Sequence, residues 1–227
     1  MKIAVISDIH SNYEALLSVM DHIEQKEVQN IFCCGDLIGY NSRPNEVIEL
    51  LKEKDVQSVR GNHDDALFTG AANFNPVAKE CLEVNREILT NENLEYLKDL
   101  NQIATHEMND KDIVQVHGSP RDPINAYIYE ESINESFIED QGITQDVILM
   151  GQTHKPYVKE VQGKLFVNPG SVGQPRDGDP RAAYALIDLE KEQVSIIRRE
   201  YDVDATVENN KDVGMPDGVG ERLYKGI

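Results

Sequence analysis

Residues 148–157 read ILMGQTHKPY, an apolar run that ends at a glycine, a glutamine, a threonine and a histidine. A short apolar run bounded by turn residues is typical of a buried strand. The polar residues that follow it, Gln152 and His154, fit either an ordinary loop or a metal site. The choice depends on whether other predicted strands in this chain end in the same way.

Short apolar runs alternate with amphipathic segments along the chain, which predicts β-α units. Strands are expected within residues 2–7, 30–34, 56–60, 112–118, 146–151 and 164–170, and an antiparallel hairpin is expected around Lys191–Glu192. Helices are expected within residues 11–27, 43–54, 76–100 with a break near 90–93, and 218–227. Ser11 and Glu14 have the spacing of a capping box for the first helix. The order of elements predicts mixed sheets flanked by helices.

The chain has 227 residues, 40% of them hydrophobic, and a formal net charge of −19. This suffices for one α/β domain spanning residues 1–227. The acidic surface opposes stable nucleic-acid binding, because that binding depends on Lys and Arg neutralising phosphates. It does not exclude a small phosphorylated substrate held by a local cation. No run has the length of a signal or membrane segment, so we expect a cytoplasmic protein without a membrane partner, either monomeric or homo-oligomeric.

Metal-binding residue types follow five of the predicted strands. In chain order they are Asp8 and His10, then Asp36, then Asn62 and His63, then His117, then Gln152 and His154. Ligands bind at this edge of α/β sheets. Each cluster alone also fits a turn or a helix start, whereas the ordered set favours a site for cations such as Mn²⁺, Zn²⁺ or Fe²⁺. A carboxylate such as Asp36 can bridge two ions, one on each oxygen, and paired ions activate water for displacement at phosphorus.

Cys33 and Cys34 are adjacent in a predicted strand, so they are expected to point to opposite faces. Cys81 stands alone in a predicted helix. The chain has no C-x-x-C spacing, so we expect all three cysteines in the core rather than in a disulfide or a metal site.

The motifs SDIHSN, CGDLIGY, RGNHDD, VQVHGSP, MGQTHKP and VNPGSVGQPR resemble those of the calcineurin-like metallophosphoesterase superfamily. The similarity runs from Met1 to about Tyr201, and within the superfamily the chain is similar to the small single-domain bacterial and archaeal phosphodiesterases. It implies an α/β (α+β) fold, a four-layer α-β-β-α sandwich of two mixed sheets. It also implies hydrolysis of a small phosphodiester or phosphoanhydride by hydroxide bound to two divalent metal ions. Mn²⁺ is expected, with Fe²⁺, Zn²⁺, Mg²⁺ and Ni²⁺ as alternatives.

The resemblance assigns roles to individual positions. Asp8, His10, Asp36 and His154 match the family's ligands of the first metal ion. Asp36, Asn62 and His117 match the ligands of the second metal ion. His63 matches the catalytic histidine that stabilises the transition state or protonates the leaving oxygen.

Two positions depart from the family pattern. Gln152 stands where the family usually has a histidine of the second metal site. An amide oxygen is a weaker donor to transition metals, which predicts a weaker second site that favours Mn²⁺ or Mg²⁺ over Zn²⁺. Gly39 replaces the aspartate that orients the catalytic histidine in protein phosphatases, so we expect either Asp64 or a backbone carbonyl to orient His63.

Arg121 and Arg176 lie in loops after motif strands, where each either binds a substrate phosphate or is simply solvated. Tyr127 and Tyr129 alternate as on a strand, either to stack on a nucleobase or to pack at a hairpin. Two other functions use the same family of folds. A scaffold with a weakened metal site would be consistent with Gln152, and a nuclease is disfavoured by chain length and charge.

Overall fold

The computed structural model describes residues 1–227 and contains two five-stranded mixed sheets. Their strand orders are β10-β9-β1-β2-β3 and β4-β5-β6-β8-β7. Strands β1, β2 and β3 are parallel, as are β5, β6 and β8, and the remaining pairings are antiparallel. The strands are β1 (Lys2–Ile6), β2 (Asn30–Cys33), β3 (Gln57–Ser58), β4 (Ile103–Met108), β5 (Lys111–Val116), β6 (Val147–Leu149), β7 (Tyr157–Val161), β8 (Lys164–Asn168), β9 (Ala182–Asp188) and β10 (Gln193–Arg199).

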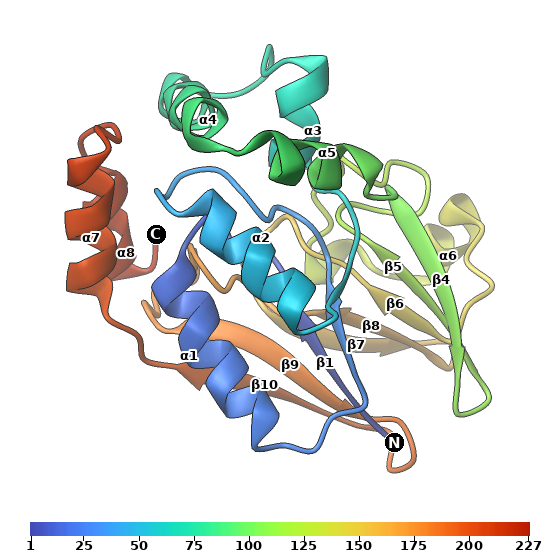
Figure 1. Ribbon diagram of the computed structural model, residues 1–227. Coiled ribbons are helices and arrows are strands. Elements are labelled where there is room, and N and C mark those ends of the chain that lie inside the picture. Colours follow the sequence, from blue (N-terminus) through green and yellow to red (C-terminus); the bar gives the residue numbers. More distant parts are fainter.

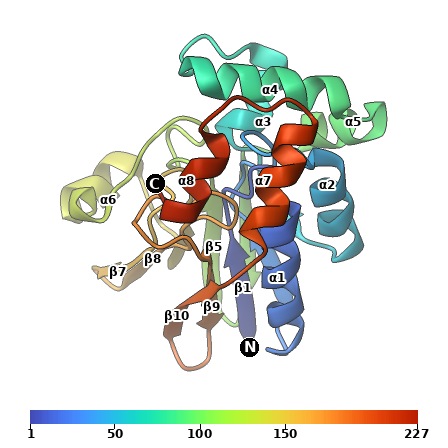
Figure 2. The same cartoon turned by 90° about the vertical axis from the view of Figure 1, so that its left-hand side faces the viewer.

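The helices cover the two outer faces of the paired sheets and the edge above them (Figure 1). Figure 2 shows α1 and α2 on one side of the sheets and α6 on the other. No helix combines the length and the apolar character needed to cross a membrane. The helices are α1 (Tyr13–Glu24), α2 (Pro44–Glu53), α3 (Asn62–Thr69), α4 (Pro76–Ile88), α5 (Asn91–Asp99), α6 (Glu135–Gln141), α7 (Val203–Asp212) and α8 (Val219–Lys225), with a short 3₁₀ turn at Glu130–Ser132.

Three apolar layers hold the sandwich together. Along β1, Ala4 and Ile6 pack with α1 and α2, whereas Ile3 and Val5 pack between the sheets. This follows from the alternation of side chains along a strand. A third cluster lies between the second sheet and α6. The predicted four-layer α-β-β-α sandwich is confirmed.

The cysteines lie where they were expected. Cys33 belongs to the cluster under the helices, and Cys34 belongs to the cluster between the sheets. Cys81 is buried as well, and all three are free thiols.

The local predictions hold for most elements. The late hairpin is confirmed, with Asp188 opposite Gln193, but the edge strands β4 and β7 and the helices α3, α6 and α7 were not anticipated. The capping box was wrong, because α1 is capped by Asn12, whose side chain accepts from the Ala15 amide. Ser11 instead donates its hydroxyl to Oδ1 of Asn85 at 2.8 Å.

Candidate metal centre

All seven predicted ligands lie at the carboxyl ends of strands, and the paired sheets bring these ends together. Asp8 and His10 follow β1, Asp36 follows β2, Asn62 follows β3, His117 follows β5, and Gln152 and His154 follow β6. Five of the seven have a left-handed backbone, with φ between 50° and 69°: Asp8, His10, Asp36, Gln152 and His154. Such conformations in non-glycine residues concentrate at functional sites, because the surrounding fold must hold them.

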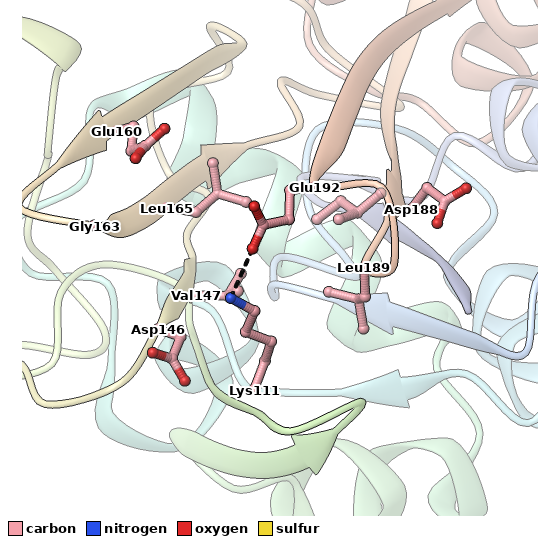
Figure 3. A pocket seen from close by; sticks show the side chains of 10 residues that line it. Lys111, Asp146, Val147, Glu160, Gly163, Leu165, Asp188, Leu189 and Glu192 are labelled. Carbon is pink, nitrogen blue, oxygen red and sulfur yellow. Dashed lines mark hydrogen bonds and ion pairs between the residues drawn. The ribbon is translucent and has the colours of Figure 1, made fainter.

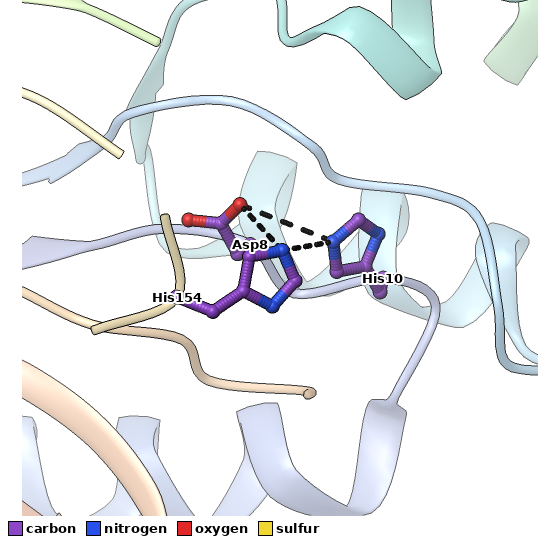
Figure 4. A group of neighbouring side chains, drawn as sticks. All are labelled: Asp8, His10 and His154. Atoms are coloured by element: carbon purple, nitrogen blue, oxygen red, sulfur yellow. Dashed lines mark hydrogen bonds and ion pairs between the residues drawn. The ribbon is translucent and has the colours of Figure 1, made fainter. Parts of the chain in front are cut away.

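The first group of ligands consists of Asp8, His10 and His154, all buried (Figure 4). Nε2 of His154 lies 3.2 Å from Oδ1 of Asp8 and 3.2 Å from Nε2 of His10. Asp36 closes this group, because its Oδ2 lies 3.6 Å from Nε2 of His10. These four side chains are the ones that the resemblance assigned to the first metal ion.

The second group shares Asp36 with the first. Oδ2 of Asp36 lies 3.4 Å from Nε2 of His117, and that nitrogen lies 3.1 Å from Oδ1 of Asn62. Oδ1 of Asp36 instead accepts a hydrogen bond from the backbone amide of His63 at 2.8 Å. A single oxygen of Asp36 therefore faces both groups, which corrects the expected use of one oxygen for each ion.

The histidine nitrogens and the Asp8 oxygens are oriented so that they could bind a cation. Nδ1 of His10 contacts the Ile38 carbonyl oxygen at 3.1 Å, Nδ1 of His117 contacts that of Cys34 at 2.7 Å, and Nδ1 of His154 contacts that of Gln174 at 2.5 Å. Backbone acceptors on Nδ1 are the usual way in which a protein turns Nε2 toward a metal ion. Both carboxylate oxygens of Asp8 are buried and lack a hydrogen-bond partner. The residues therefore fit a bound divalent cation.

The electrostatics of the cluster agree with this fit. Burial lowers the pKa of His10 and of His154 well below the usual value, and it raises the pKa of Asp8 to about 7. Burial alone would lower the pKa of His117, but the carboxylates of Asp36 and Asp8 raise it to about 10. Without a cation, Asp8 and His117 therefore favour their protonated forms, which a metal ion would displace, whereas His10 and His154 are neutral and ready to bind it.

Gln152 lies in the same loop as His154, and its side chain is buried. Its Nε2 donates to the Asn125 carbonyl oxygen at 3.4 Å, and its Oε1 makes no hydrogen bond. This arrangement leaves an amide oxygen available as a ligand.

His63 is buried at the start of α3, among three aromatic rings. The ring centroids of His10, Tyr40 and Phe74 lie 4.7, 4.8 and 4.7 Å from that of His63. Its Nδ1 is buried and has no hydrogen-bond partner. Burial lowers its pKa to about 4, against the effect of the Asp36 carboxylate.

Neither expected partner orients His63. Asp64 accepts instead from the backbone amides of Gly61, Leu37 and Ile38, at 2.9–3.1 Å. No backbone carbonyl contacts Nδ1 either. The ring is held by packing rather than by a hydrogen bond.

The two candidate arginines lie in different surroundings. The Arg176 backbone amide donates to the His154 carbonyl oxygen at 3.4 Å, and its Nη2 lies 3.3 Å from Oη of Tyr40. Its charge also lowers the pKa values of His154 and His63. Arg121 is exposed and contacts none of these residues through its side chain. The structure therefore brings Arg176, and not Arg121, to the cluster.

Tyr127 and Tyr129 are about half exposed, at 51% and 45%, and lie outside any strand. The expectation that they pack at a hairpin was wrong. The pKa of Tyr127 is raised by burial, and the charges of Arg176 and Asp36 also act on it. Tyr127 therefore lies within electrostatic reach of Arg176 and Asp36.

Three residues near the cluster were not found from the sequence. Asn85 of α4 is buried, and it accepts from the Gly39 amide at 2.7 Å and donates to the Asn41 carbonyl oxygen at 2.8 Å. Tyr40 and Arg222 lie beside Arg176. No pattern in the sequence marks Asn85 or Arg222, and Tyr40 lies in the CGDLIGY motif without an assigned role, because the importance of all three comes from contacts with distant segments.

A separate cavity of about 90 Å³ lies at the opposite edge of the sheets (Figure 3). It is lined by the amino ends of β5, β6 and β8 and by the β9–β10 turn. Four acidic residues surround it, and Lys111 is paired with Glu192 at 2.9 Å. It has neither the histidines nor the free cations of a phosphate site.

Two mixed sheets packed face to face, with Asp, His and Asn gathered at their carboxyl edge, define the metallophosphoesterase class of protein. Residues 1–192 match the model of the calcineurin-like phosphoesterase superfamily domain. The chain therefore belongs to this superfamily, whose members are metal-dependent hydrolases of phosphate esters.

Known relatives extend over the whole chain. The chain is 35% identical over 242 residues to the uncharacterized protein MJ0912 of Methanocaldococcus jannaschii, covering 99% of this chain and 98% of that protein. It is 28% identical over 202 residues to phosphodiesterase YfcE of Escherichia coli, covering 83% and 88%. The crystal structure of a metallophosphoesterase from Sphaerobacter thermophilus superposes with a TM-score of 0.83 at 34% identity, covering 100% of this chain and 99% of that one.

Proposed function

We propose that the protein hydrolyses a small phosphodiester or phosphoanhydride, with two divalent metal ions held by Asp8, His10, Asp36, Asn62, His117, Gln152 and His154. The observation that carries this proposal is the Oδ2 atom of Asp36, which lies within 3.6 Å of His10 and 3.4 Å of His117. One carboxylate oxygen between the His10–His154 pair on one side and His117 with Asn62 on the other fits a pair of cations.

The metal ions, when bound, would lower the pKa of a water molecule and stabilise the attacking and leaving oxygens at phosphorus. The protein contributes the rest. Asp36 is fixed by the His63 amide through Oδ1, which leaves Oδ2 facing His10 and His117, where Asp36 would be shared by the two metal ions. His63 interacts with a phosphoryl oxygen or the leaving oxygen. Arg176 neutralises the phosphate and orients it by a bidentate contact.

Gln152 bears on the choice of metal ion. Its free Oε1 is an oxygen donor, and oxygen donors suit Mn²⁺ and Mg²⁺ better than they suit Zn²⁺. We therefore propose Mn²⁺ as the working ion, with a weaker second site.

The substrate is proposed to be small, because a net charge of −19 opposes long polyanions. Tight, salt-sensitive binding of DNA would contradict this. The proposal also includes a cytoplasmic location and a single domain over residues 1–227. A single cooperative unfolding transition is the expected sign of one domain.

The test is hydrolysis of bis(p-nitrophenyl) phosphate by protein reconstituted with Mn²⁺. Asp36→Asn and His63→Ala are expected to lower kcat about 100-fold or more, the usual cost of losing such a group. Asp146→Asn and His22→Ala, which change the same residue types away from the cluster, are the matched controls. Wild-type hydrolysis no faster than that of Asp36→Asn would refute the proposed function.

A further inference from the structure

The helix pair α7–α8 lies beyond residue 192, where the superfamily match ends, yet α7 contacts the loops that carry the candidate metal ligands. In Figure 2 the two helices lie side by side below α4. Met215 and Val219 pack with Tyr40 and with two residues of α4. Tyr40 in turn lies 4.9 Å, between ring centroids, from the candidate ligand His10. Tyr40 is thus the single residue that separates the C-terminal segment from the candidate ligand His10.

Polar contacts fix α7 to the loops that carry the ligands. Nδ2 of Asn210 donates to Oδ1 of Asn41 at 2.9 Å, and Asn41 donates to the His10 carbonyl oxygen at 2.9 Å. Thr206 donates its hydroxyl to Oδ1 of Asn12 at 3.2 Å. All of these side chains are buried. The position of α7 is therefore determined relative to the first ligand group.

The end of α8 is fixed to the loop that carries Arg176. The Gly178 amide donates to the Gly226 carbonyl oxygen at 2.9 Å. Gly226 has φ +65°, and a Cβ atom there would lie 2.6 Å from the Asp179 backbone. Only glycine allows this close approach. Arg222 and Arg176 are thus held in fixed relative positions.

The two guanidinium groups lie over the same aromatic ring. Cζ of Arg176 is 5.7 Å and Cζ of Arg222 is 5.9 Å from the Tyr40 centroid. Neither arginine forms an ion pair with an Asp or Glu side chain, although the chain has 41 acidic residues and only 22 basic ones. Nε of Arg222 donates to a main-chain oxygen of Ile227 at 2.9 Å, and the guanidinium also hydrogen-bonds to the Tyr40 side chain.

Two guanidinium groups that face one ring without an Asp or Glu side chain beside them repel each other. Burial and then the charge of Arg176 lower the pKa of Arg222. An anion with several oxygens would relieve this repulsion, and planar guanidinium groups bind phosphate oxygens in pairs. The metal ions and Arg176 suffice for the phosphate that reacts, so Arg222 is left for a further one.

We propose that Arg222, together with Arg176 and Tyr40, forms a subsite for a second phosphoryl group, so that the preferred substrate carries linked phosphates as in a phosphoanhydride. This rests on the proposed function, because the first phosphoryl group is placed at the metal centre. The α7–α8 pair is then a specificity element outside the matched superfamily domain.

The first test measures anion binding without catalysis. Inorganic pyrophosphate is titrated into the metal-free protein and its Kd is measured by calorimetry. Arg222→Gln is expected to raise Kd about tenfold or more, since hydrogen bonds to charged groups contribute about 1.5–3 kcal/mol. Lys225→Gln, with the same loss of charge on an exposed position of the same helix, is expected to leave Kd unchanged. Equal Kd values for wild type and Arg222→Gln would overturn the proposal.

The second test compares two substrates of the Mn²⁺-loaded enzyme. Arg222→Gln is expected to lower kcat/KM for diadenosine tetraphosphate at least tenfold more than for bis(p-nitrophenyl) phosphate. An equal loss on both substrates would contradict a second-phosphate subsite. If Arg222→Gln is poorly folded by circular dichroism, Arg222→Lys replaces it, and an intermediate loss is expected because the charge remains and the bidentate contact is lost.

The two proposals fail in different ways. If wild type cleaves neither substrate but binds pyrophosphate through Arg222, the proposed function fails and the anion subsite stands. If wild type cleaves the diester while Arg222→Gln binds pyrophosphate as wild type does, the subsite fails and the function stands.

Discussion

Nδ1 of His63 lies so close to Gly39 that a Cβ atom at position 39 would be only 2.3 Å from it. Protein-phosphatase relatives have an aspartate at this position, which orients the catalytic histidine. Here the absence of a side chain lets the imidazole pack directly on the backbone. Packing against Gly39, Tyr40 and Phe74 replaces the missing hydrogen bond.

Gly39→Ala tests this packing. The backbone at Gly39 has φ +105°, so the substitution adds conformational strain to the clash with His63. We expect a loss of about 2–5 kcal/mol in the free energy of unfolding and a fall in kcat, because the ring must move. Urea denaturation measures the free energy of unfolding, and the diesterase assay measures kcat.

Gly70→Ala is the control for Gly39→Ala. Gly70 has φ +90°, but a Cβ atom there would meet nothing within 4 Å. Its substitution should therefore lose only the strain, about 1–3 kcal/mol, with kcat retained. Identical stability and kcat in the two variants would mean that Gly39 does not position His63.

Asn85 connects three segments beneath the metal centre. Asn85→Ala would leave the Gly39 amide and the Asn41 carbonyl oxygen buried without their partner. We expect a loss of about 2–4 kcal/mol, since each unsatisfied buried group costs about 1–3 kcal/mol. Asn91→Ala, on an exposed position of α5, should change stability by less than about 0.5 kcal/mol. A similar small effect for both substitutions in thermal and urea unfolding would contradict the role given to Asn85.

Gln152→His tests the weak second site. An imidazole is a stronger donor to transition metals than an amide oxygen, so the second ion should bind more tightly and the preference should move toward Zn²⁺. Calorimetric titrations with Mn²⁺ and Zn²⁺ measure both changes. Gln162→His places a histidine on an exposed turn and should change neither. Unaltered affinity and selectivity in Gln152→His would show that position 152 does not contact the second ion.

The ligands could be predicted because they follow strands whose apolar character is plain in the sequence. Parallel strands bring their carboxyl ends to one edge, so Asp8, Asp36 and His117 had to lie close together. The edge strands β4 and β7 were harder to predict, because alternate side chains are exposed and few of the others are fully buried, which dilutes the apolar signal.

The surroundings of the ligands could not be predicted for a different reason. The partner of Asn85 is a backbone amide 46 residues away, and Arg222 reaches Tyr40 only because α8 is fixed against the loop around Asp179. Likewise Asp64, next to His63 in sequence, is occupied by three backbone amides. These relationships depend on tertiary packing, which leaves no local periodicity to recognise.

The most direct test of the metal centre is the number of Mn²⁺ ions bound per chain. Metal-free protein is titrated with Mn²⁺, and the stoichiometry is measured by calorimetry and elemental analysis, with Asp36→Asn and Asp146→Asn alongside. We predict two ions per chain for wild type and for Asp146→Asn, the second ion weaker, and fewer than two for Asp36→Asn. One ion or none in wild type at millimolar Mn²⁺ would contradict the dinuclear centre.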